Sequence, residues 1–198
     1  MKKKIGRLST ARESKVAQMK YEFLNEKEIF YIDEISEKAE RIYGKEDSYL
    51  RLSLISDLTE VLDWWRSWEE SEKDDYRKVE YIEHLKDSMP SLLFVIHKSC
   101  NEEKFDLLGE YNYQNSFTKN KENLTPLNYF LTIRFNRSAK EMERYFYHVI
   151  KVICGDALAG ACVSMEYIYM IIEELGITLE EVLEYTWNKY IKWEKGLT

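Results

Sequence analysis

Apolar residues recur every three or four positions along most of this chain, which is the spacing of helices that bury one face. The pattern is clearest in residues 48–70 and 76–98, which an acidic polar link separates. Each segment is predicted to be an amphipathic helix, and the two can pack antiparallel. The apolar positions are Leu54, Ile55, Leu58, Val61, Leu62 and Trp65 in the first segment, and Ile82, Leu85, Met89, Leu92, Leu93 and Ile96 in the second.

Capping residues predict several helix boundaries. Thr178 and Glu181 have the Ser/Thr-x-x-Glu spacing in which the two side chains bond back to N–H groups of the first helical turn. Ser138 and Glu141 repeat this spacing, and Gly176 is expected to end the preceding helix. We therefore expect helices over residues 138–153, 157–175 and 179–195, and one or two more within residues 16–43.

A few places interrupt the helical pattern. Pro90 lacks a backbone N–H and is expected to kink the helix that contains it. Gly155–Asp156 is expected to break the chain between two helices. Residues 101–128 have no clear period and are predicted to be a long loop. Residues 127–135 are the most strand-like piece and could form a short hairpin, although a short helix fits them equally well.

Composition agrees with a helical fold. The chain has 198 residues, of which 44% are hydrophobic, enough for one domain with a real core. Only seven Gly and two Pro interrupt a sequence rich in Glu, Lys and Leu, which favours long helices over a many-stranded sheet. The prediction is an all-α, single-domain helical bundle over residues 16–198, preceded by a basic and flexible arm over residues 1–15.

Charge and cysteine content narrow the class of protein. A formal net charge of −7 argues against a general nucleic-acid binder, which usually carries a basic excess. No run approaches the roughly 18 apolar residues of a membrane span, and the start of the chain lacks the apolar core of a secretory signal. Cys100, Cys154 and Cys162 show no pairing pattern and are expected to be free thiols, so we predict a cytoplasmic protein without membrane contacts.

Carboxylates recur at helical spacing on both central segments. Residues three or four apart share a helix face, so two such rows can face each other across a narrow gap. Facing carboxylates repel unless a cation lies between them, and Mg²⁺ prefers such oxygen ligands. The competing interpretation is a set of exposed surface acids, and His84 lies in register with the second row. The candidate metal ligands are Asp57, Glu60, Asp63, Glu80, Glu83 and Asp87.

The order of these segments resembles the all-α NTP pyrophosphohydrolases, which include MazG proteins and dimeric dUTPases. That family carries E-x-x-E and, a dozen or more residues later, E-x-x-D on adjacent helices. This chain has Glu60-x-x-Asp63 and then Glu80-x-x-Glu83, with sixteen residues between the two pairs. The stretch RSWEE after the first pair is similar to the family's lysine-x-tryptophan stretch, and residues 175–196 are similar to its closing helix.

The resemblance implies a Mg²⁺-dependent hydrolase that releases a nucleoside monophosphate and pyrophosphate from a nucleoside triphosphate, which is deoxyuridine triphosphate in dUTPase-like members. Glu60 and Glu83 are the candidate catalytic residues, since a carboxylate would orient the attacking water. Lys189, Lys192 and Lys195 are the candidates for contacting the substrate phosphates. The resemblance also implies a homodimer, and the aromatic content of 14% agrees with self-association.

A different register keeps a second function open. Aligning Trp68 with the family's tryptophan puts Leu54 and Asp57 at the first acidic pair, and His84 and Asp87 at the second. Two of the four ligands are then missing. The alternative is a catalytically degenerate helical protein of the same fold that acts through protein–protein contacts. The two functions differ in whether the acids of the two helices converge or point to solvent.

Overall fold

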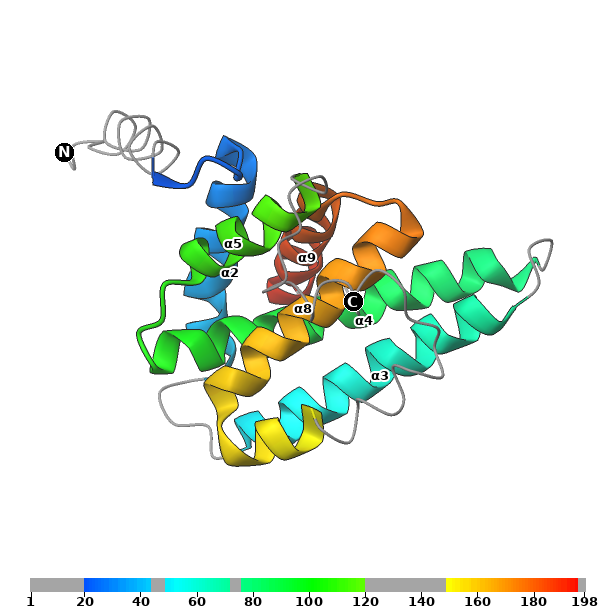
Figure 1. The fold of residues 1–198 in the computed structure, drawn as a ribbon, viewed down its shortest axis with the longest axis horizontal. Coiled ribbons are helices and arrows are strands. Elements are labelled where there is room, and N and C mark those ends of the chain that lie inside the picture. Colours follow the sequence, from blue (N-terminus) through cyan, green and yellow to red (C-terminus); the bar gives the residue numbers. More distant parts are fainter. Residues whose placement is uncertain (1–19, 44–48, 72–75, 120–148, 196–198) are drawn as a thin grey trace.

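All regular secondary structure in the described part of this protein is helical. The computed structural model describes residues 20–43, 49–71, 76–119 and 149–195, and contains no strand within them (Figure 1). The all-α prediction is confirmed for these residues. A helical stretch over residues 149–155 precedes α8. The other helices are α2 (Glu26–Tyr43), α3 (Leu50–Glu70), α4 (Arg77–Glu102), α5 (Leu107–Lys119), α8 (Ala157–Leu175) and α9 (Leu179–Glu194).

Helices α3 and α4 form the antiparallel hairpin that the hydrophobic pattern predicts. The predicted stripe of α3 is buried at Leu54, Leu58, Val61 and Trp65. Burying such a side chain contributes about 1.5–3 kcal/mol. Helix α4 continues on both sides of Pro90, which is itself buried within it.

The two halves of α4 have different surroundings. The inner half, including residues 92–100 without interruption, is buried. Helix α4 packs against α2, α8 and α9 as well as α3. The outer end of the hairpin, where α3 ends and α4 begins, projects beyond the rest of the molecule (Figure 1). A long helix therefore serves as core at one end and as free surface at the other.

A buried polar network joins the inner half of α4 to its neighbours. Ser36 Oγ lies 2.9 Å from His97 Nδ1, and Tyr111 Oη lies 2.9 Å from His97 Nε2. Burial lowers the pKa of His97 to about 3, so the ring stays neutral at ordinary pH. The hydroxyl of Tyr169 donates to the backbone oxygen of Tyr111. Helices α2, α4, α5 and α8 are thus tied together by hydrogen bonds inside the core.

The predicted helix boundaries around α8 are confirmed. Asp156 caps α8 by accepting hydrogen bonds from Leu158 N at 2.9 Å and Ala159 N at 3.1 Å. A side chain at Gly160 would meet Ile153 within 2.6 Å, so the close approach of the two helical segments requires glycine. Helix α8 ends at Gly176, whose left-handed φ of 67° suits a C-terminal cap.

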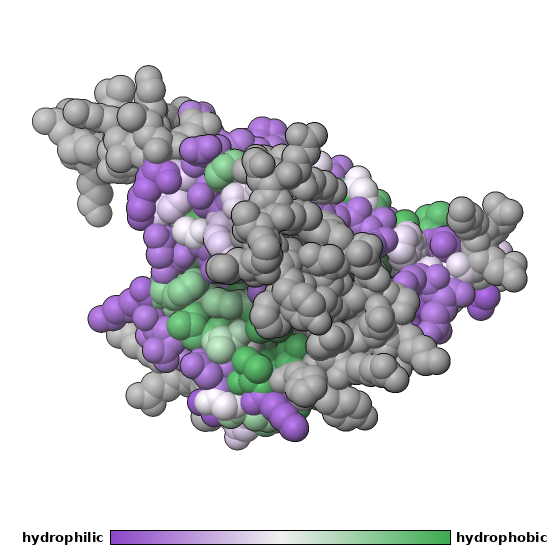
Figure 2. Space-filling model, in the orientation of Figure 1, coloured by the Kyte–Doolittle hydropathy of each residue, from purple (hydrophilic) through white to green (hydrophobic). Residues whose placement is uncertain are grey.

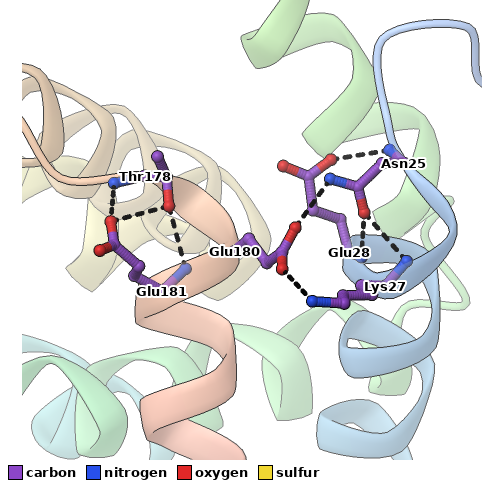
Figure 3. Close-up of polar contacts among 6 residues, drawn as sticks. All are labelled: Asn25, Lys27, Glu28, Thr178, Glu180 and Glu181. Atoms are coloured by element: carbon purple, nitrogen blue, oxygen red, sulfur yellow. Dashed lines mark hydrogen bonds and ion pairs between the residues drawn. The ribbon is translucent and has the colours of Figure 1, made fainter.

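The predicted capping box of α9 is also confirmed. Glu181 accepts from the backbone N and the hydroxyl of Thr178, and Glu181 N donates back to Thr178 Oγ1. The residue before Glu181, Glu180, binds the side chains of Asn25 and Lys27 at the start of α2 (Figure 3). These contacts fix the N-terminal end of α9 and hold it beside α2.

The predicted loop over residues 101–128 is wrong in its described part, because α4 continues to Glu102 and α5 occupies Leu107–Lys119. Asn-rich sequence weakened the helical signal, but tertiary contacts stabilise this helix. Asn112 Oδ1 accepts from Phe23 N, and Asn115 Nδ2 donates to Phe23 O. The basic arm, the strand-like piece and the Ser138 capping box lie outside the described residues. No helix among the described residues is long and apolar enough to cross a membrane.

Candidate functional site

The predicted acids of α3 differ in how far they are buried. Asp57 is half-buried and Glu60, one turn further on, is exposed. Burial, and then the charge of Glu60, raises the pKa of Asp57 to about 6. Asp63 is also exposed and pairs with Arg66 at 3.2 Å. Asp57 is therefore the acid of α3 whose protonation the fold controls.

The acids in the middle of α4 face α9. The carboxylate of Asp87 lies 2.8 Å from Lys189 Nζ, which also donates to the backbone oxygen of Asp87 at 2.5 Å. Glu83 lines a groove between the two helices and pairs with Lys86 at 3.4 Å. Both acids of this predicted row thus have partners on their own helix or on α9.

The remaining predicted acid, Glu80, takes part in a third group. Its carboxylate lies 3.7 Å from His84 Nε2, and the His84 ring stacks on Trp64 with 3.9 Å between ring centroids. Trp64 belongs to α3, so the stack joins the two arms of the hairpin. Among the described residues, no three His, Cys, Asp or Glu side chains are grouped so that they could hold a metal ion.

The structure therefore does not bring the six candidate ligands into one cleft. The two helices pack antiparallel as expected, and the contacts of Glu83 and Asp87 with other helices are with α9, at the groove lining and at Lys189. Of the candidate catalytic pair, Glu83 lines the groove beside α9, and Glu60 is exposed on α3. Sequence spacing places residues on one helix face but leaves open which neighbouring helix that face meets.

The three lysines predicted to contact phosphate differ in their surroundings. Lys189 is held by Asp87, with both its carboxylate and its backbone oxygen as acceptors. Lys192 and Lys195 are exposed at the end of α9. The sequence did not indicate the pairing of Lys189, because Asp87 lies 102 residues away in the chain.

A groove lies between α4 and α9, and one of the predicted acids, Glu83, is part of its lining. It has a volume of about 270 Å³. Met89 and Val182, both nearly fully buried, provide an apolar floor, and Tyr185 provides an aromatic wall. The lining residues of this α4–α9 groove are Glu83, Lys86, Met89, Ile177, Glu181, Val182 and Tyr185.

Carboxylates dominate the electrostatics of the α4–α9 groove. Burial, and then the charges of Asp87 and Glu83, raise the pKa of Tyr185. The hydrogen bonds from Thr178, and further away the ammonium of Lys86, hold the pKa of Glu181 below its usual value. Lys86 thus contributes positive charge near both carboxylates of the lining. The aromatic wall lies in a negative potential, which favours a cationic ligand.

Apolar side chains are exposed at the start of α4, the helix that also contributes Glu83 to the α4–α9 groove. Tyr76 is 85% exposed and Val79 is 68% exposed, just before Glu80 and Glu83. These four residues are spaced three and four apart, so they share one side of α4. We call them the outer α4 surface. Figure 2 shows hydrophobic patches among hydrophilic ones on this projecting part of the hairpin.

The sequence analysis missed the role of Lys86 and Tyr185 in this site. Tyr185 belongs to the predicted final helix, but no local pattern distinguishes a groove-lining tyrosine from a core tyrosine. The useful signal was at the start of α4, where Tyr76 and Val79 stand outside the apolar stripe that begins at Ile82. Large apolar residues outside the buried stripe indicate a contact surface.

No family model matches this chain, and no curated protein or solved structure matches it either. The resemblance to dUTPases and MazG proteins therefore stays a prediction. What the structure establishes for the described residues is an all-α arrangement in which α4 has exposed apolar residues at its start and contributes Glu83 to a groove with carboxylates in its lining.

Proposed function

We propose that this protein acts by binding another protein through the outer α4 surface and the α4–α9 groove. The observation that carries the proposal is the exposure of Tyr76 and Val79 on a hairpin that projects from the molecule. Tyrosine is enriched among the residues that contribute most to protein interfaces. Among the described residues, only α3 lies beside the tip of this projecting hairpin (Figure 1).

The charges around this surface favour a basic partner. Glu80, Glu83 and Glu181 are exposed there, and Lys189 is paired with Asp87. The whole chain carries a formal net charge of −7. A second copy of the chain would bring acidic surfaces together, whereas a segment with arginine or lysine would meet complementary charge. The predicted homodimer would then need a different surface.

The division of the acids supports this function over hydrolysis. Metal-assisted phosphoryl chemistry needs carboxylates grouped around one cation. Here Glu83 and Asp87 face α9, while Asp57 and Glu60 belong to α3. One observation keeps the Mg²⁺-dependent pyrophosphohydrolase as a second candidate: the raised pKa of Asp57 beside Glu60 is what a cation would relieve.

An assay of pyrophosphate release separates the two candidates. A panel of nucleoside triphosphates that includes deoxyuridine triphosphate is incubated with the protein, with and without millimolar Mg²⁺. The binding function predicts no release above the protein-free control and no rise of melting temperature with Mg²⁺. Release that disappears in both Asp57→Asn and Glu60→Gln would establish the hydrolase instead.

A further inference from the structure

The α4–α9 groove combines three features that usually recognise one kind of side chain. Its floor is apolar, at Met89 and Val182, and suits a methylene stem. Its wall is the ring of Tyr185, which attracts a cation placed over its face. Its lining includes the carboxylates of Glu83 and Glu181, which accept hydrogen bonds from a charged donor.

We propose that the α4–α9 groove is a specificity pocket for an arginine side chain presented by the protein partner. The proposal rests on the proposed function, because it names the residue by which the partner is recognised. The stem of the arginine lies on Met89 and Val182, and its guanidinium lies between Tyr185 and the two carboxylates. The outer α4 surface contacts the residues that flank this arginine.

Other ligand classes fit the groove less well. An anion would meet Glu83, Glu181 and the nearby Asp87, which disfavour negative charge. A metal ion lacks a grouped ligand set among the described residues. Lysine shares the charge of arginine, but a guanidinium is planar, stacks on an aromatic ring and donates to two carboxylates at once. An arginine can therefore interact with more residues of the groove lining than a lysine can.

The site is partly preorganised. Glu181 is fixed by its capping box with Thr178, so its carboxylate does not need to be ordered when a ligand binds (Figure 3). Lys86 already places an ammonium 3.4 Å from Glu83 and near Glu181. This internal cation competes with the ligand, so removal of Lys86 strengthens binding.

The test is a titration of the full chain with a capped arginine, N-acetyl-arginine methylamide, followed by amide chemical shifts in two-dimensional NMR. Capped citrulline, which is uncharged and nearly the same shape, is the matched ligand control. The capped arginine should bind saturably and shift the amides of Val182 and Tyr185. Citrulline should bind at least about tenfold more weakly, because it lacks the charge.

Single substitutions assign the binding to the groove. Glu83→Gln should lower the affinity for capped arginine by about fivefold, and Lys86→Gln should raise this affinity by about threefold. Asp63→Asn is the matched control, since Asp63 is an exposed carboxylate of α3 that belongs neither to the groove lining nor to the outer α4 surface. All three positions are solvent-accessible, so these variants are expected to fold. Equal affinity for arginine and citrulline, an unchanged Kd in Glu83→Gln, or no saturable binding would each overturn the proposal.

One further variant tests the arginine pocket and the proposed protein-binding surface separately. The double variant Tyr76→Ser/Val79→Ser leaves the groove lining intact, so it should bind capped arginine like the parent protein. The same variant should lose binding to a protein partner. If capped arginine binds as expected but the double variant keeps every protein contact, the pocket stands and the proposed contact surface is wrong.

Discussion

The two halves of α4 belong to one continuous helix but differ in burial. Residues 92–100 are all buried, and they include the hydrogen-bonded His97. At the other end, Val79 and Tyr76 are largely exposed, and the acids that follow them face solvent or α9. Both ends carry large apolar residues, so hydrophobicity alone does not separate core from contact surface.

What separates the two halves is the number of helices around them. The inner half meets helices on several sides, whereas the first turns of the outer half, before the acids that meet α9, have α3 beside them and project into solvent. Folding stability should therefore depend on the inner half, and recognition on the outer half. The substitutions below test this division, beginning with the largest expected effect.

Matched truncations in the two halves give the strongest contrast. Leu93→Ala removes a side chain with no exposed surface, and should lower the free energy of unfolding by about 3 kcal/mol because it leaves a cavity. Val79→Ala removes a side chain that is 68% exposed, and should change stability by less than about 0.5 kcal/mol. Urea denaturation measures both, and equal losses would refute the division.

The buried polar network allows a second comparison. Tyr111→Phe removes the hydroxyl that lies 2.9 Å from His97 Nε2, which leaves a buried ring nitrogen without this partner. The free energy of unfolding should fall by about 1–3 kcal/mol. Tyr76→Phe removes the same atom from a side chain that is 85% exposed, and should leave the urea midpoint unchanged. A stable Tyr111→Phe protein would show that the network contributes little.

The cap of α8 should have a smaller effect than these core changes. Asp156→Ala removes the acceptor for Leu158 N and Ala159 N, and should cost about 1 kcal/mol of stability. Asp63→Ala, at an exposed carboxylate that pairs with Arg66, should cost less than about 0.5 kcal/mol. Thermal melting of the two variants side by side provides the measurement.

Asp57 should make stability depend on pH. Its pKa is raised to about 6 in the folded protein, so the folded state holds a proton that the unfolded state releases near pH 4. Stability should fall as pH rises from about 4 to 6 and stay lower at pH 7. Asp57→Asn should then gain about 1 kcal/mol at pH 7, after allowance for partial exposure, and nothing at pH 4. Equal effects at both pH values would contradict this.

The sequence predicted most of the described helices and their caps, because these depend on local spacing. Thr178 with Glu181, Gly176 and the break at Asp156 act within one or two turns of the chain. Helix α5 was missed, since its contacts with Phe23 come from a distant segment. Contacts between distant segments cannot be predicted from a single sequence.

The candidate site was harder to predict for the same reason. The spacing of Glu83 and Asp87 showed that they share a face of α4, but the neighbour of that face is α9, far along the chain. The helical period fixes positions around one axis and says nothing about the rotation of that axis in the bundle. The acid rows therefore suggested one cleft where the structure has separate groups.

Site-specific photo-crosslinking tests the central claim most directly. A photoreactive amino acid replaces Val79 in one version of the protein and Leu52 in another, since Leu52 is exposed to a similar extent at the opposite end of α3. After irradiation in the cells that make the protein, Val79 should give a discrete adduct with another protein, and Leu52 should not give that adduct. The same adduct from both positions, or an adduct at Val79 with a second copy of this chain alone, would contradict the account.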